Sequence, residues 1–98
     1  MSADRAGQLV GIDVGTSGAK VVLIDEKGAV LRSATGAYPM ATPAPGWTEQ
    51  NPDDWHRVVQ ECLDEIDAPD DAAIGFTGQM HGAVFLDAAD RVIRPALL

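Results

Sequence analysis

The sequence is poor in basic residues. Lys and Arg together number 7, against 15 Asp and Glu, which gives a formal net charge of −8. Nucleic acids and anionic membranes attract basic surfaces, so we expect neither as the main partner. An acidic chain can still hold a phosphate group locally, through backbone N–H groups, a lysine or a metal ion.

Cysteine and long apolar runs are also scarce. Cys62 is the single cysteine, so no internal disulfide can form, and a reducing, cytoplasmic compartment is the simpler expectation. The polar start "MSADRAGQ" is followed by an apolar segment that Asp13 interrupts, which predicts neither a signal peptide nor a membrane span. The 98 residues, 46% hydrophobic and 22% charged, indicate a globular protein of one domain or part of one.

Short apolar segments separated by turn residues predict an α/β chain. After a loose terminus at 1–8, three strands are expected to form an antiparallel meander, joined in part by the turn "DEKG". A further strand and a closing hairpin are expected after one helix. The expected strands cover 9–15, 20–25, 29–39 and 72–78, and the hairpin arms cover 83–87 and 91–98.

One helix is expected after a proline-rich loop at 40–50. Asn51 is a good N-cap, and Pro52 suits the first helical position. The apolar residues that follow recur at i, i+3, i+4, i+7, i+8 and i+11 from Trp55, which is one face of a helix. The helix is expected to end near Asp67, because Pro69 follows.

The stretch "GIDVGTSGAK", residues 11–20, contains the groups that hold phosphates but fits neither common phosphate loop. A Walker A loop and a dinucleotide fingerprint both open a helix, whereas a strand follows here. The remaining option is a hairpin turn whose N–H groups face an anion. Gly15 and Gly18 are expected to supply positive φ angles and a close approach. Thr16 and Ser17 would add hydroxyl groups, and Lys20 a positive charge.

Asp13 is unusual because aspartate is rare inside strands. A carboxylate buried there has to be paired or to bind a metal. Beside a phosphate turn it would suit Mg²⁺, which keeps several waters and uses one or two carboxylates plus phosphate oxygens. The alternative is a plain hairpin in which Asp13 caps local N–H groups.

These residues resemble a known superfamily. Asp13-Val14-Gly15-Thr16-Ser17, with Lys20 further on, resembles the first phosphate motif of the actin, sugar-kinase and heat-shock-chaperone ATPases. Those proteins share a ribonuclease-H-like α/β fold of three antiparallel strands, a helix and a parallel strand, which is the order predicted above.

Two further segments narrow the resemblance. Residues 45–59 and 74–98 are similar to the FGGY family of carbohydrate kinases, and the run Gly78-Gln79-Met80-His81-Gly82 is similar to that of its xylulokinases. The chain at 9–98 is thereby identified as the N-terminal portion of the first domain of such a kinase. Its ending, "PALL", looks cut, and a catalytic aspartate base and the adenosine site would lie beyond Leu98.

The resemblance implies an ATP- and Mg²⁺-dependent kinase that converts D-xylulose to D-xylulose 5-phosphate. Asp13 would be important for activity and hold the metal, directly or through water. The ATP phosphates would bind Gly15, Thr16, Ser17 and Lys20, and the sugar would contact Gln79, Met80 and His81. The full-length enzyme could be a homodimer, and the fragment alone is expected to be inactive.

Other interpretations stay open at this stage. Without the resemblance, His81 is as readily a hydrogen-bonded structural residue, and Gln79 as readily satisfies nearby backbone groups. The enzyme could act on another sugar or polyol of the same family. The chain could also belong to a non-kinase ATPase of the superfamily, whose nucleotide switches its shape and which needs no acceptor pocket at 78–82.

Overall fold

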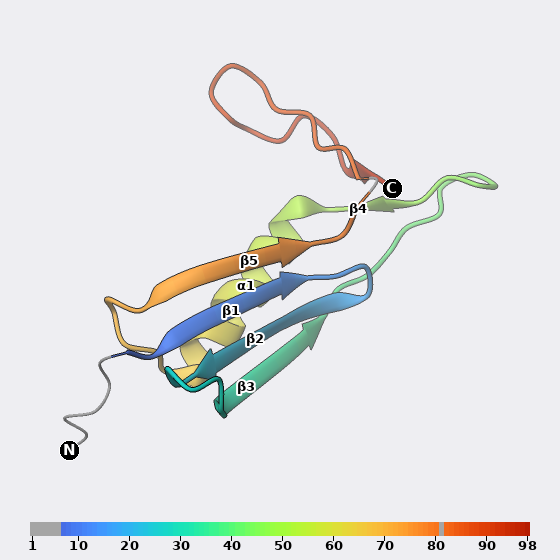
Figure 1. Ribbon diagram of the computed structural model, residues 1–98. Helices are drawn as coiled ribbons and strands as arrows, with labels where there is room; N and C mark the ends of the chain where they lie inside the picture. The colour runs from blue at the N-terminus through green and yellow to red at the C-terminus, as the bar shows by residue number, and fades with distance from the viewer. Residues whose placement is uncertain (1–6, 81) are drawn as a thin grey trace.

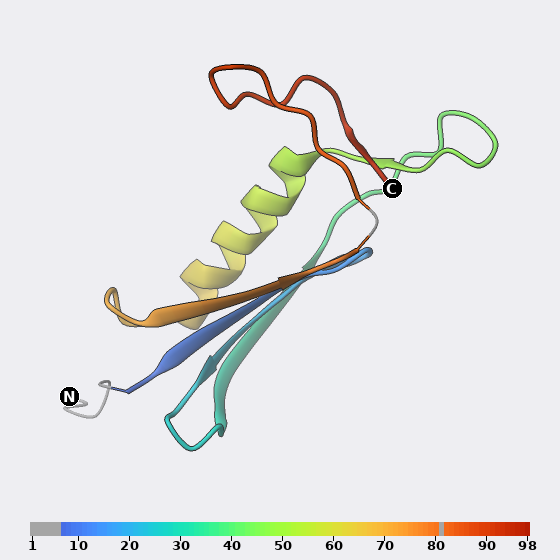
Figure 2. The same cartoon turned by 45° about the horizontal axis from the view of Figure 1, so that its top comes forward.

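A computed structural model describes residues 7–80 and 82–98, so most of the loose terminus expected at 1–8 lies outside the described residues. One helix lies across one face of a four-stranded sheet (Figures 1 and 2). The sheet order is β3-β2-β1-β5, with β1 antiparallel to β2, β2 antiparallel to β3, and β1 parallel to β5. The strands are β1 (Leu9–Val14), β2 (Gly18–Ile24), β3 (Val30–Ala37) and β5 (Ala73–Gly78). This confirms the predicted order of meander, helix and parallel strand.

The helix α1 (Pro52–Ile66) has the predicted bounds. The Asn51 side chain caps it by accepting a hydrogen bond from the Asp53 N–H at 3.0 Å. At its other end, Asp67 adopts the left-handed conformation with φ 48°. No helix within residues 7–80 and 82–98 is long and apolar enough to span a membrane.

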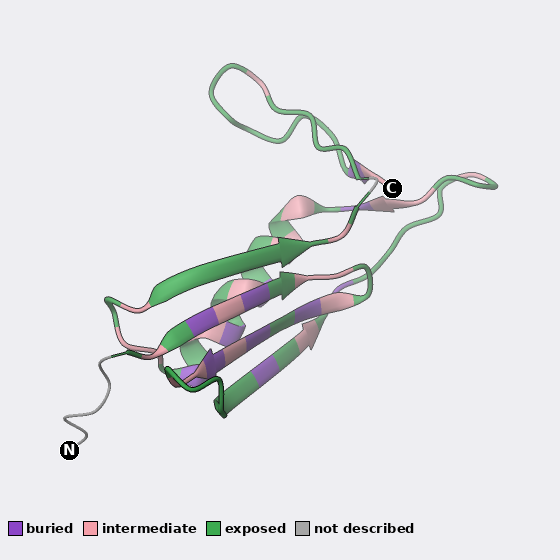
Figure 3. Cartoon of the chain, viewed as in Figure 1, coloured by how far each residue is buried: buried purple, intermediate pink, exposed green. Residues whose placement is uncertain are grey.

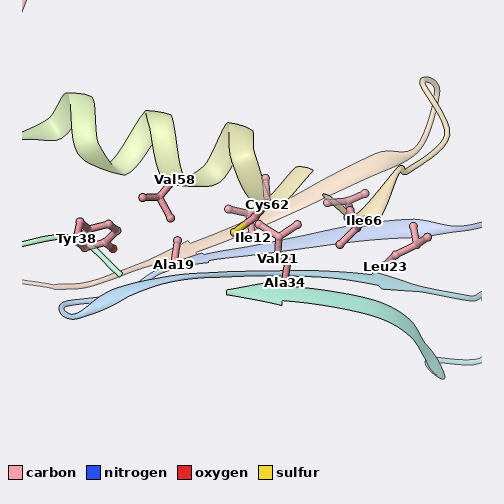
Figure 4. Close-up of a cluster of buried hydrophobic side chains, with 10 residues drawn as sticks. Ile12, Ala19, Val21, Leu23, Ala34, Tyr38, Val58, Cys62 and Ile66 are labelled. Atoms are coloured by element: carbon pink, nitrogen blue, oxygen red, sulfur yellow. The ribbon is translucent and has the colours of Figure 1, made fainter. Parts of the chain in front are cut away.

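The hydrophobic core lies between α1 and the sheet (Figure 4). Alternate residues of β1 and β2 are buried, as the two-residue period of a strand requires. α1 packs mainly against β2 and β3, so β5 remains exposed along its whole length (Figure 3). The buried residues are Val10, Ile12, Ala19, Val21, Leu23, Ala34, Tyr38, Val58, Cys62 and Ile66.

Gly36 allows α1 to approach β3 closely, because a Cβ at this position would lie 2.6 Å from Val58 Cγ1. Gly36→Ala is therefore expected to destabilise the protein by about 1–3 kcal/mol through overpacking. Urea unfolding of the protein that contains this chain measures the change. Gly75→Ala is the control, since its Cβ would meet nothing within 4 Å. Wild-type stability in the Gly36 variant would contradict the close packing.

The closing hairpin is less regular than predicted. Its two expected strands at 83–87 and 91–98 reduce to isolated bridges and to β6 (Ala96–Leu97). Pro95 has no N–H to give to a ladder, and the Asp87 carboxylate accepts the N–H groups of Ala89 and Arg91 in place of strand pairing. The expectation of two regular strands is therefore wrong, although the arms still run antiparallel.

The loop expected at 40–50 ends in a short strand, β4 (Glu49–Gln50), which the sequence did not indicate. β4 pairs antiparallel with β6. The pairing is reinforced by an ion pair between the Arg94 guanidinium and the Glu49 carboxylate, and by a 3.0 Å hydrogen bond from the Leu98 N–H to the Thr48 carbonyl. These contacts fix the closing hairpin to the segment that leads into α1.

Candidate functional site

Two loops meet at one end of the sheet. The β1–β2 turn (Gly15–Gly18) follows β1, and the post-β5 loop (residues 78–82) follows β5. Because β1 and β5 are parallel, with Val14 in register with Gly78, both strands end at the same edge (Figure 1). The Gln79 N–H donates to the Val14 carbonyl at 2.9 Å, which binds the second loop to the end of β1.

Gly15 and Gly18 serve the turn through space rather than through backbone angle. A Cβ on Gly18 would lie 2.3 Å from the Gly36 carbonyl oxygen, and one on Gly15 would lie 3.1 Å from the Gly18 carbonyl oxygen. The expected positive φ angles at these two glycines are wrong, whereas the expected close approach is confirmed. Among the described residues, the glycines with positive φ are Gly7, Gly28 and Gly46.

Hydrogen bonds hold the β1–β2 turn while leaving some of its groups available. The Gly15 N–H donates to the Gly18 carbonyl at 3.0 Å. The Tyr38 phenol donates to the Gly15 carbonyl, and the Tyr38 N–H donates to the Ser17 carbonyl at 3.3 Å. Within the described residues, the N–H groups of Thr16 and Ser17 make no hydrogen bond. Two adjacent amides of this kind suit an anion.

The Tyr38 hydrogen bond predicts a pH effect. Burial raises the pKa of the Tyr38 phenol above its usual 10.0, and the Asp13 carboxylate raises this pKa further. The protonated phenol is the donor, so its contribution to folding is complete below about pH 10 and is lost as the pH rises through the raised folded-state pKa. The difference in unfolding free energy between wild type and Tyr38→Phe should therefore shrink between about pH 9 and about pH 11 in urea titrations. A constant difference would contradict this role.

Asp13 is exposed, on the face of the sheet opposite α1. The expected burial of its carboxylate is wrong, because the alternation of β1 turns Val10 and Ile12 toward α1 and Asp13 away from it. Lys20 is its direct cross-strand neighbour and is also exposed. Within the described residues the two make no ion pair.

Asp13 and Lys20 line a hollow of about 380 Å³ on this outer face. Gly11 and Gly75 also line the hollow, and their lack of side chains makes it deeper. Among the described residues, no three His, Cys, Asp or Glu side chains gather as a metal-binding group. Asp13 alone fits Mg²⁺, an ion that draws its other ligands from water and phosphate, better than a metal that needs several protein ligands.

The structure places two of the three predicted sugar contacts. Gln79 is half-buried: its Nε2 donates to Gln50 Oε1 at 3.1 Å, and its Oε1 accepts from Thr16 Oγ1 at 3.1 Å. Each end of this amide retains capacity for a further hydrogen bond. Met80 is 80% exposed, and His81 lies outside the described residues. Their contacts with a sugar stay predictions.

Sequence reasoning missed Gln50, which is only 2% exposed. Its Nε2 donates to the Thr16 carbonyl at 2.5 Å, and its Oε1 accepts from Trp55 Nε1 at 3.0 Å. Gln50 was read as part of a proline-rich loop. The available signal was Trp55, whose indole N–H needs an acceptor when it is buried.

Comparison with known proteins agrees with this geometry. The chain is 43% identical over 93 residues to the xylulose kinase of Escherichia coli K12, covering 91% of this chain and 19% of that protein. It is 41% identical over 92 residues to a xylulose kinase sequence of an Arthrobacter species, covering 92% of this chain and 90% of that sequence. The chain spans about a fifth of the length of most of these curated relatives.

Solved structures show the same fold. A kinase from Brucella ovis whose title reads "xyloylose kinase" has a TM-score of 0.86 at 41% identity, covering 93% of this chain and 20% of that one. Gluconate kinase from Lactobacillus acidophilus has a TM-score of 0.84 at 28% identity, covering 92% of this chain and 19% of that one. Residues 8–98 match the model of the FGGY family of carbohydrate kinases, N-terminal domain. The chain therefore belongs to the FGGY family of carbohydrate kinases.

Proposed function

We propose that this chain is the N-terminal part of a xylulose kinase, which transfers the γ-phosphoryl group of ATP to D-xylulose and yields D-xylulose 5-phosphate. The observation that carries the proposal is the meeting of two loops, where Thr16 Oγ1 donates to Gln79 Oε1 at 3.1 Å. Phosphoryl transfer depends on holding donor and acceptor together in line. The xylulose kinases named above support D-xylulose as the acceptor.

The β1–β2 turn would hold the ATP phosphates. The unbonded N–H groups of Thr16 and Ser17, together with the exposed Ser17 hydroxyl, are donors suited to phosphate oxygens. Lys20 would add a positive charge from the neighbouring strand. The Thr16 hydroxyl already donates to Gln79, so we assign Thr16 to phosphate binding through its backbone N–H.

Asp13 would hold Mg²⁺, directly or through water. Its carboxylate is exposed and makes no ion pair within the described residues, so it is available as a ligand. When bound, the metal neutralises phosphate charge during transfer. In a chain of net charge −8, this compensation matters for bringing a polyphosphate beside a carboxylate.

The post-β5 loop would hold the acceptor. We assign Met80 and His81 to contacts with the sugar, with Gln79 linking them to the β1–β2 turn. The hydroxyl proton would pass to an aspartate base that the resemblance places beyond Leu98. A cytoplasmic location and a homodimer of the full-length enzyme remain predictions.

A coupled assay of the full-length protein tests this function on D-xylulose, other ketoses, gluconate and glycerol. We expect kcat/KM for D-xylulose to exceed that for the others by about tenfold or more. The fold does not discriminate here, since a gluconate kinase and a xylulose kinase from Lactobacillus acidophilus both reach a TM-score of 0.84 at 28% identity. A preference for gluconate or glycerol would overturn the substrate, and ATP hydrolysis that no acceptor accelerates would overturn the kinase.

A further inference from the structure

We propose that Gln50 is a positioning residue for this reaction: its buried side chain holds the β1–β2 turn and the post-β5 loop at a fixed separation, so that bound ATP and sugar meet in line. The inference rests on the proposed function, because that function assigns ATP to the turn and the sugar to the loop. Gln50 itself touches neither substrate in this assignment.

Gln50 is the only buried polar side chain among the described residues that lies away from the surface at 2% exposure. It bonds to three segments that are distant in sequence. Its Nε2 donates to the Thr16 carbonyl of the turn, and its Oε1 accepts from Gln79 Nε2 of the loop and from Trp55 Nε1 of α1. The turn and the loop are thus both fastened to the helix that covers the core.

The partners fix the orientation of the Gln50 amide. The Thr16 carbonyl can only accept and the Trp55 indole can only donate, so Nε2 must face Thr16 and Oε1 must face Trp55. The remaining capacity of Oε1 then requires a donor from Gln79, which leaves Gln79 Oε1 to accept from the Thr16 hydroxyl. No other residue type provides this donor and this double acceptor in the same shape.

The four hydrogen bonds close a ring through Gln50, Thr16 and Gln79. The Thr16–Gln79 bond joins exposed groups and competes with water, whereas the bonds of Gln50 are sheltered and hold their geometry. Loss of Gln50 would leave the turn and loop joined at their rim and at the Gln79–Val14 backbone bond alone. Since a misplacement of about 1 Å can cost about a hundredfold in rate, the separation matters for transfer.

Gln50→Met in the full-length enzyme is the principal test, because methionine keeps the volume and removes the hydrogen bonds. We expect kcat for sugar phosphorylation to fall roughly ten- to a hundredfold, while KM for ATP and for sugar each change by less than about threefold. ATP hydrolysis without sugar should not fall, because water needs no positioned loop. An unchanged kcat, or a loss confined to either KM, would overturn the proposal.

Val58→Ala is the stability control, since it removes core packing on α1 without touching the turn or the loop. It should lower the unfolding temperature and leave kcat within about twofold of wild type. If Val58→Ala lowers kcat as much as Gln50→Met does, the effect is general destabilisation and the proposal fails.

Gln50→Glu is a second variant that keeps the side-chain shape. A carboxylate cannot donate to the Thr16 carbonyl, but a protonated carboxyl can, and burial beside Glu49 and Asp54 favours its protonation. The ratio of variant to wild-type kcat should therefore rise as the pH is lowered from about 8 to about 6 for Gln50→Glu and stay flat for Gln50→Met. Equal pH profiles for both variants would overturn the role assigned to the Nε2 donor.

Amide hydrogen exchange separates this proposal from the proposed function. In Gln50→Met, the N–H groups of Gly15 and Gln79 should both lose protection by about fivefold or more relative to amides of β2. This result is expected even if the wild-type enzyme phosphorylates no sugar, in which case the proposed function fails and the mechanical link stands. Unchanged protection at either amide would refute the link whatever the substrate.

Discussion

Asp13→Ala is expected to lower kcat of the full-length kinase roughly 10²–10⁴-fold, because it removes the carboxylate proposed to hold Mg²⁺ at the transferring phosphate. Among the described residues that line the outer hollow, Asp13 is the one carboxylate. A water molecule in its place could complete the metal shell but would supply no negative charge. The coupled assay, with Mg²⁺ titrated at fixed ATP, should also show a higher Mg²⁺ requirement.

The same substitution should leave the fold intact. The Asp13 side chain is exposed and makes no ion pair within residues 7–80 and 82–98, so its removal leaves neither a cavity nor an unsatisfied partner. Its negative charge raises the pKa of Tyr38, an effect that its loss would only relax. We expect the unfolding temperature to change by less than about 3 °C.

Two variants sharpen this test. Asp64→Ala removes an exposed carboxylate from α1, far from the turn, and should leave kcat and the Mg²⁺ requirement unchanged. Asp13→Asn keeps the shape and one oxygen but removes the charge, and should lose nearly as much activity as Asp13→Ala. Near-wild-type turnover in either Asp13 variant would exclude the magnesium role, and a large loss in Asp64→Ala would show that the assay reports net charge instead.

The parts of the fold that local chemistry determines were predictable from sequence. The cap at Asn51, the proline at Pro52 and the apolar period from Trp55 act within a few residues of one another, and α1 forms where they indicate. The outward direction of Asp13 was also available, because alternation with Val10 and Ile12 implies it. Reading the strand as buried on both faces was the error.

The features that sequence reasoning missed depend on contacts between distant segments. Nothing near Gly18 shows that the Gly36 carbonyl of another strand will lie against it. Likewise, the partners of Gln50 come from 34 residues earlier and 29 residues later in the chain. Local patterns give no register between separate strands, and without a register neither the clash at Gly18 nor the network of Gln50 can be foreseen.

Gly18→Ala is expected to destabilise the protein by about 2–4 kcal/mol, more than the other glycine substitutions considered. Its Cβ would lie 2.3 Å from the Gly36 carbonyl oxygen and 3.1 Å from the Ala37 Cα, and both are backbone atoms. A side chain could rotate away, but relief here requires β2 and β3 to separate where Gly18 pairs with Ala37. Urea unfolding of the full-length protein measures the loss.

Gly28→Ala is the matched control for this clash. Gly28 lies in the β2–β3 turn with φ +86°, and a Cβ there would meet nothing within 4 Å, so its cost of about 1 kcal/mol comes from backbone conformation alone. Equal losses in the two variants would contradict the steric argument.

The separation of β2 from β3 would also move Ser17, whose carbonyl is held by the Tyr38 N–H at 3.3 Å. If the β1–β2 turn binds the ATP phosphates, Gly18→Ala should therefore raise KM for ATP about tenfold or more in the protein that remains folded, with a smaller change in KM for the sugar. Gly28→Ala, at the opposite end of β2, should change neither. A destabilised Gly18→Ala enzyme with an unaltered KM for ATP would show that the turn is structural and that the nucleotide binds elsewhere.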